Sequence, residues 1–267
     1  MGLIITNICL LTILIAGGES FNIEFNKNPS TPETWTGKWF PRKPTESPDP
    51  IQHDTRIPMG VANGDCDDGQ NHLETDWFDE TVNYTCYDHL SNYGPDRARR
   101  PIYEIENIPP SYMAAHVCMN ESISYDQIIP TFGSHRPLWP KWGEYKFVPR
   151  QRWLHNLEHG GLVMLYHPCA NRGQVKALKA LVKNCLYRHV ITPYNLLSPE
   201  RPLALVAWGS RLQMSVVSKK VVVSFIKEAA LNGPEHTAKQ GQYSHGLLQD
   251  AKIVSTQTDD LLCPDLY

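Results

Sequence analysis

Short apolar runs and amphipathic stretches follow one another through the second half of the chain. Apolar runs bounded by glycine or proline predict strands at 161–166, 189–194, 203–208 and 212–217. Apolar positions at helical spacing predict helices at 174–186 and 221–229. A tight turn at Gly209-Ser210 can join the last two strands. This order of elements predicts an α+β fold with a mixed or mostly antiparallel sheet and two helices packed on one face.

The first half of the chain lacks this periodicity. Residues 3–16 are mainly apolar and precede Gly17-Gly18, which predicts a signal peptide over 1–18. The run is shorter than the ~20 residues that a spanning helix needs, and an uncleaved anchor is the alternative. Residues 19–60 are rich in proline and are predicted to be long, irregular and extended or disordered.

The rest of the chain divides into three predicted parts by composition. A loop-rich, cysteine-containing extension spans 61–111, and the main domain spans 112–235. A polar tail, 236–267, is tied to the domain by Cys263. Within the main domain, residues 112–125 alternate enough to include a strand, with His116 and Cys118 on one face.

Cysteine usage indicates an oxidising compartment. Of seven cysteines, one lies in the predicted signal peptide, and the others can form three disulfides: Cys66, Cys86, Cys118, Cys169, Cys185 and Cys263. A helix over 174–186 would hold Cys169 and Cys185 too far apart to pair with each other, and the other connectivities stay open. Sequons at Asn83 and Asn120 predict glycosylation. Together these features predict a secreted or secretory-lumen glycoprotein, with no stable membrane span in the mature chain.

Charge excludes one class of partner. The formal net charge is −3 with 20 % charged residues, so no concentrated basic face for nucleic acid is expected. An unknown protein or small molecule is the expected partner. The acidic stretch 65–69 is predicted to be a disulfide turn with a solvated face.

The densest chemistry lies in His155-x-x-Glu158-His159. This spacing matches inverted zinc metallopeptidases, in which a helix directs two histidines at one metal. Gly160-Gly161 follows at once, and glycine is a poor helix former, so the segment is predicted to be extended and to enter the next strand. In an extended segment, His167 lies in phase with His159.

Two hypotheses for this segment remain open. In the first, His135, His155 and His159 bind zinc or copper, with Glu158 as a ligand or an outer partner. In the second, the same groups form a buried hydrogen-bond network without a metal. No catalytic residue is assigned, and a binding domain is favoured over an enzyme. The enzyme alternative is a metal-dependent hydrolase with Glu158 as general base. The tryptophans Trp139, Trp142 and Trp153 are predicted to belong to the core.

Several short motifs occur in an order that resembles a known family. They are Gly133-Ser134-His135 with Trp139, Gly143-x-Tyr145, the segment 155–160, Leu197-Ser198-Pro199 and Ala207-Trp208-Gly209. Together they resemble the family called domain of unknown function 3105. His116-x-Cys118-Met119 and the segment 151–160 are similar to its animal branch, the tumour protein p53-inducible protein 13 proteins. The resemblance implies no established reaction and only a loose association with growth control.

Overall fold

The structure is a computed structural model that describes residues 59–88, 91, 93–235 and 237–265. The predicted signal peptide, 1–18, lies outside the described residues, and so does the proline-rich segment 19–60 apart from its last two residues. Among the helices of the described part, none is long and apolar enough to cross a membrane.

Seven strands of the described residues form one mixed sheet in the order β1-β6-β5-β3-β4-β2-β7. The strands are β1 (Ile102–Ile105), β2 (Gly143–Tyr145), β3 (Leu162–Tyr166), β4 (His189–Pro193), β5 (Leu203–Ala207), β6 (Ser210–Met214) and β7 (Leu247–Asp250). β4 pairs in parallel with β3 and with β2, and the other neighbours pair antiparallel. The predicted mixed sheet is therefore confirmed, and β3, β4 and β5 lie where the apolar runs placed them, whereas β6 begins at Ser210, two residues before the predicted run 212–217.

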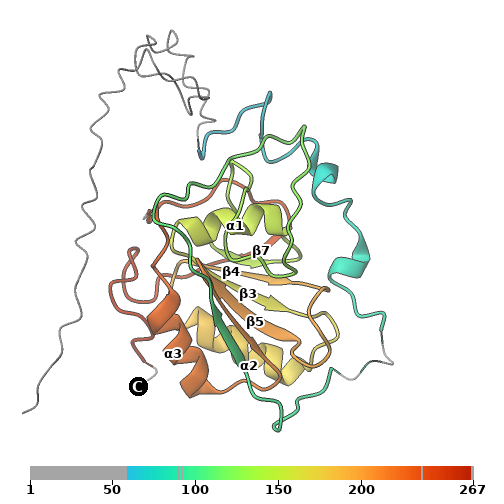
Figure 1. The fold of residues 1–267 in the computed structure, drawn as a ribbon, viewed down its shortest axis with the longest axis vertical. Helices are drawn as coiled ribbons and strands as arrows, with labels where there is room; N and C mark the ends of the chain where they lie inside the picture. Colours follow the sequence, from blue (N-terminus) through green and yellow to red (C-terminus); the bar gives the residue numbers. More distant parts are fainter. Residues whose placement is uncertain (1–58, 89–90, 92, 236, 266–267) are drawn as a thin grey trace, which may run out of the picture. The chain divides into compact units, whose positions relative to one another are not determined.

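The helices cover both faces of this sheet (Figure 1). They are α1 (Arg150–Glu158), α2 (Arg172–Lys183) and α3 (Lys219–Ala229). α2 and α3 share one hydrophobic cluster on one face, which confirms the two predicted helices on one side. α1 lies against the opposite face with a second cluster. Two short 3-10 turns, Leu73–Thr75 and Thr81–Asn83, lie in the extension before the main domain.

The central strand β3 shows how the sequence pattern builds these two layers. Leu162 and Met164 face the α2/α3 cluster, whereas Val163 and Leu165 face the α1 cluster. All four side chains are fully buried, and burial of each contributes roughly 1.5–3 kcal/mol. A strand buried on both faces reads as a continuous apolar run, which is why its prediction succeeded. The predicted core tryptophans, Trp139, Trp142 and Trp153, are buried as well.

Three disulfides connect the extension and the tail to the sheet. They join Cys66 to Cys118, Cys86 to Cys169, and Cys185 to Cys263. The expectation that Cys169 and Cys185 do not pair with each other is confirmed, because α2 separates them.

Three local expectations are wrong. The segment 155–158 is the end of helix α1 rather than the extended entry to a strand. The stretch 112–125 contributes only an isolated bridge between His116 and His135. Asp67, in the acidic stretch expected to be solvated, is only 2 % exposed and bonds to Arg152. The first and third errors share an origin, because buried polar side chains carry no hydrophobic period.

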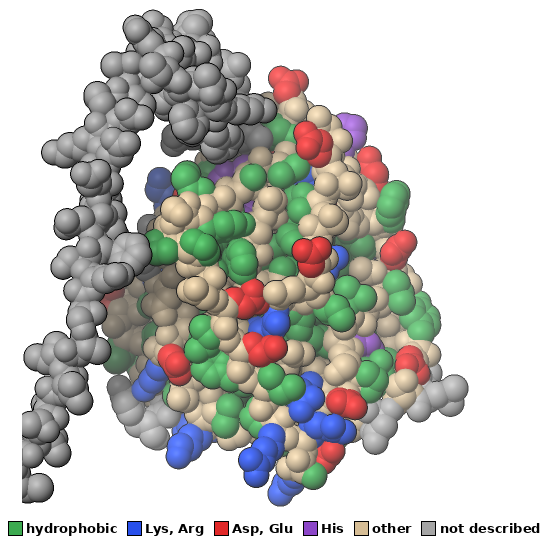
Figure 2. Space-filling view, viewed as in Figure 1, with side chains coloured by type: hydrophobic (Ala, Val, Ile, Leu, Met, Phe, Trp, Pro, Cys, Tyr) green, Lys and Arg blue, Asp and Glu red, His purple; other side chains and the backbone are tan. Residues whose placement is uncertain are grey.

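The surface seen in Figure 2 mixes both signs of charge, with acidic and basic side chains interspersed over the described part of this face and several basic groups together at its lower end. The pattern agrees with a net charge near neutrality.

Candidate metal centre

Helix α1 ends directly at the histidine motif. The amide of Gly161 donates to the carbonyl oxygen of Asn156, and the amide of Gly160 donates to that of Leu157. Gly160 has a positive φ of 77°. These two bonds and the left-handed glycine form a Schellman motif, which ends helices and satisfies their last carbonyls. The glycine pair directly follows His159 and terminates α1 without disrupting the helical turns before it.

Four side chains from three segments meet beside this helix end. His155 and Glu158 project from α1, His135 comes from the loop 133–136, and His116 comes from the loop before it. One donor atom from each lies within 4.8 Å of all the others. We call these four residues the His/Glu cluster.

Backbone carbonyls fix the orientation of three imidazoles in this region. Nδ1 of His135 lies 2.8 Å from the carbonyl oxygen of Gly133, and Nδ1 of His155 lies 2.6 Å from that of Arg136. Nδ1 of His159 lies 2.9 Å from the carbonyl oxygen of Glu235. Because a carbonyl oxygen only accepts, each Nδ1 carries the proton and donates it. In the neutral ring the lone pair is then on Nε2.

The remaining ring nitrogens have no hydrogen-bond partner among the described residues. Nε2 of His116, His135, His155 and His159 and Oε2 of Glu158 are all buried and unpartnered. Oε2 of Glu158 lies 3.0 Å from Nε2 of His135 and 3.8 Å from Nε2 of His116 without forming a hydrogen bond. Leaving such a group buried and unpaired costs roughly 1–3 kcal/mol, so five together form an unusual arrangement.

Burial favours the neutral form of His116, His155 and His159 by lowering their pKa values. Burial lowers the pKa of His116 to about 4, and the nearby His135 acts in the same direction. Burial also lowers the pKa of His155 far below its usual range and lowers the pKa of His159. A neutral imidazole is the form that binds a metal, so the protonation state suits a ligand.

The surroundings bury three of the four cluster residues, whereas the side chain of His116 is 15 % exposed. His135 is 0 % exposed and Glu158 is 4 % exposed. The ring of Trp139 lies 4.9 Å from that of His155 and 4.5 Å from that of His159, measured between centroids. Gly233 packs against the end of α1 so closely that any side chain there would overlap backbone atoms of residues 157–160. The segment that follows carries Glu235, and burial together with the charge of Glu158 raises the pKa of the Glu235 carboxyl.

The structure brings together most of the residues that the sequence singled out. His135, His155 and Glu158 belong to the cluster, and the ring of His159 lies 4.7 Å from that of His155, measured between centroids, at a tilt of 37°. His116 was not among the expected ligands, although it stands in a family motif, because nothing in its spacing connects it to a helix that begins 34 positions later. His167 takes no part in the cluster: its ring stacks on Tyr93, and its Nδ1 accepts the Cys169 amide. Asn120 is exposed and Asn83 is partly buried, and their glycosylation stays a prediction.

The donor set fits a divalent transition metal. Three imidazole nitrogens and one carboxylate oxygen are ligands that zinc accepts at ~2.0–2.2 Å. The Nδ1 bonds of His135 and His155 to carbonyl oxygens are the outer contacts that metal-binding histidines usually make. Closing the donors around an ion requires shifts of about 1 Å or less, since they already lie within 4.8 Å of one another.

The fold and the site together define a disulfide-bonded α+β domain with a buried His/Glu cluster that could hold a metal ion. Residues 116–242 match the family model described as "Protein of unknown function (DUF3105)". The match begins at the first cluster histidine and contains the other three cluster residues, and it supports the family resemblance seen in the short motifs. No curated protein and no solved structure matches the chain.

Proposed function

We propose that this domain binds one divalent metal ion, zinc in the first place and copper as the second choice, through His116, His135, His155 and Glu158. The observation that carries the proposal is the convergence of buried, unpartnered donor atoms on one point. His159 stands beside these ligands as a fifth donor with its Nδ1 already occupied. Imidazole suits both metals, and four protein donors in a compact group suit the tetrahedral preference of zinc.

A hydrogen-bond network without a metal explains the cluster less well. Such a network would pair each lone pair with a donor, yet the Nδ1 protons of His135, His155 and His159 already go to backbone carbonyls. Nε2 of each of these three rings is therefore an acceptor, and neither these atoms nor Oε2 of Glu158 has a hydrogen-bond partner among the described residues. A cation satisfies all the acceptors at once.

Two features favour a closed site over a hydrolytic one. Catalytic zinc keeps an open position for water, whereas structural zinc has four protein ligands. Here four protein donors are present, and Glu158 is grouped with the ligands rather than standing off from them. The helical setting of His155, Glu158 and His159 does match the zinc-peptidase motif. The hydrolase with Glu158 as general base nevertheless needs a water-filled cleft beside residues that are almost fully buried.

The cellular setting belongs to the same proposal. Three disulfides and two sequons support a secreted or secretory-lumen glycoprotein, since disulfides persist in oxidising compartments. The animal-branch motifs around His116 and 151–160 support kinship with the tumour protein p53-inducible protein 13 proteins. A role in growth control rests on that kinship alone.

Elemental analysis tests the metal. The full chain is purified from a secretory host without an affinity tag that binds metals, and zinc and copper are measured per mole of protein. We expect about one metal ion in the unmutated protein and a strong loss in His155→Ala. His189→Ala is the matched control, because His189 is also buried and its Nδ1 also bonds to a carbonyl oxygen, that of Leu186, outside the cluster. An unmutated protein that holds neither metal, even after incubation with each, contradicts the proposal.

A further inference from the structure

Two of the segments that carry cluster residues are fastened to each other directly. The amide of Arg136 donates to the carbonyl oxygen of Gln151 on α1 at 2.9 Å, and Nδ1 of His155 donates to the carbonyl oxygen of Arg136. His135 is adjacent to Arg136, so it is held against α1 by two bonds. The positions of His135, His155 and Glu158 are therefore fixed within the domain core.

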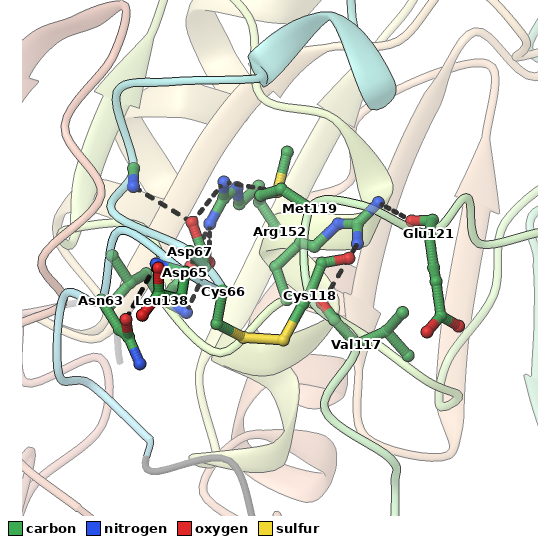
Figure 3. The surroundings of a disulfide bond; sticks show 12 residues. Asn63, Asp65, Cys66, Asp67, Val117, Cys118, Met119, Glu121, Leu138 and Arg152 are labelled. Atoms are coloured by element: carbon green, nitrogen blue, oxygen red, sulfur yellow. Dashed lines mark hydrogen bonds and ion pairs between the residues drawn. A yellow bond between two sulfur atoms is a disulfide. The ribbon is translucent and has the colours of Figure 1, made fainter.

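His116 enters the cluster from a different segment. Its neighbours pair with His135 as a short parallel bridge, through the amides of Val117 and His135. The guanidinium of Arg136 donates to the carbonyl oxygens of Val117 and Cys118. Two residues after His116, the disulfide from Cys118 leads to Cys66 (Figure 3). No helix or strand of the described residues contains His116.

The far end of that disulfide is anchored on α1. Asp67, next to Cys66, accepts hydrogen bonds from Nη1 of Arg152 at 2.5 Å and from Nη2 at 2.9 Å. Nη2 of Arg152 also lies 3.2 Å from the sulfur of Met119, which follows Cys118. Arg152 precedes His155 by three residues on the helix, roughly one turn. Figure 3 shows Asp67, Arg152, Cys66 and Cys118 in this arrangement.

We propose that the Cys66–Cys118 disulfide and the Asp67–Arg152 ion pair act as one brace that positions His116 as the fourth metal ligand. Cys66 and Asp67 touch no metal donor, so their role is to position. The brace runs from Arg152 on α1 through Asp67 and Cys66 to Cys118. It therefore holds His116, two residues before Cys118, against the helix that carries His155. Metal retention by the domain consequently depends on the oxidised disulfide. This inference rests on the proposed metal site.

A double-mutant cycle on the full chain from a secretory host tests the brace. Zinc affinity is measured by chelator competition in four proteins: unmutated, Cys66→Ser/Cys118→Ser, His116→Ala, and the combination. We expect the disulfide variant to bind zinc about 10- to 100-fold more weakly, as when an outer-shell partner of a metal ligand is removed. In the His116→Ala background, removal of the disulfide should cost less than about threefold further, because its effect passes through His116.

The visible spectrum of bound cobalt(II) gives a readout that general destabilisation would not produce. Loss of one protein ligand changes the coordination, so the disulfide variant should shift toward the spectrum of His116→Ala. The matched control is Cys86→Ser/Cys169→Ser, which removes another disulfide that contacts no cluster residue. We expect this control to retain the unmutated affinity and spectrum.

Several results would overturn the brace. Unchanged zinc affinity in Cys66→Ser/Cys118→Ser would contradict the brace but would not contradict the metal site. A further tenfold loss in the His116→Ala background shows that the disulfide acts through other ligands. Should the double serine variant fail to fold, Asp67→Asn tests the same connection with both cysteines present, and an affinity equal to that of the unmutated protein contradicts the proposal. If the unmutated protein holds no metal, the proposed function itself is wrong, and this outcome is distinct from a failure of the brace.

Discussion

The substitution Asp67→Asn should destabilise the folded domain far more than its small change in shape suggests. The Asp67 carboxylate accepts four hydrogen bonds: from the amides of Gly69 and Leu138 at 3.0 and 3.1 Å, and from Arg152 Nη1 and Nη2 at 2.5 and 2.9 Å. The side chains of Asp67 and Arg152 are each only 1 % exposed. An asparagine keeps one acceptor oxygen and turns an NH₂ group toward a guanidinium that can only donate.

The magnitude follows from the charge that is left behind. Removing one partner of a buried ion pair costs roughly 3–5 kcal/mol, because the other charge stays buried without compensation. For a domain of this size each kcal/mol lowers the melting temperature by ~2–4 °C, so the expected decrease is roughly 6–20 °C. Urea unfolding followed by tryptophan fluorescence, with calorimetry for the melting temperature, measures both quantities.

The adjacent Asp68 provides the control. Its carboxylate accepts only local bonds, from the backbone amides of Gln70 and Asn71 and the side chain of Asn71. Asp68→Asn should therefore lower the free energy of unfolding far less than Asp67→Asn does. An Asp67→Asn variant whose free energy of unfolding falls no further than that of Asp68→Asn would refute the reasoning that the pair is a buried anchor.

Two further predictions concern pH and packing. Burial lowers the pKa of His189 from 6.5 to about 4, so between these values the unfolded chain takes up a proton that the native ring refuses. The contribution of His189 to the free energy of unfolding is fully present above pH 6.5 and decreases by about 3 kcal/mol as the pH falls to 4. The urea midpoint of His189→Gln should therefore fall less steeply over this window than that of the unmutated protein. Parallel curves for the two proteins would contradict the assignment. Gly233→Ala should cost roughly 1–3 kcal/mol and weaken zinc binding, because the methyl group overlaps backbone atoms of residues 157–160 and displaces the Glu235 carbonyl from His159. Gly64→Ala, where no atom lies within 4 Å of the new methyl group, should change neither quantity.

The sheet could be predicted where its strands are buried on both sides. β3 and β5 are continuous apolar runs, and the β5–β6 hairpin turns at Gly209, whose φ is 66°. The short edge strands β1 and β7 were missed, since they are largely exposed and carry no apolar run. β2 has only three residues, too few for any period to show.

Helix α1 could not be predicted from hydrophobic periodicity, because it buries polar side chains. Arg152, His155, Asn156 and Glu158 are all inside the domain and each has a specific partner or a place at the site. The signal that would have found the helix is the glycine pair itself, which follows the helix end in the position of a Schellman motif. The glycine pair marks the end of α1, not the absence of a helix before it.

The candidate site was predictable only where its ligands lie close together in the sequence. His155 and Glu158 are one helical turn apart, and His135 stands in a family motif. His116 lies beside His135 through an isolated parallel bridge, two residues from the Cys66–Cys118 disulfide, and sequence spacing does not encode these contacts. Cysteine counting showed that three bridges were possible, but not which of them would reach the site.

X-ray absorption at the zinc edge, recorded on the full chain purified from a secretory host, tests the metal site most directly. We expect about four nitrogen and oxygen neighbours at ~2.0–2.1 Å, with the outer-shell pattern of three imidazoles and no sulfur scatterer. In His116→Ala the imidazole contribution should fall by one. A protein without bound metal, or a spectrum dominated by sulfur at ~2.3 Å, would contradict a centre built from His116, His135, His155 and Glu158.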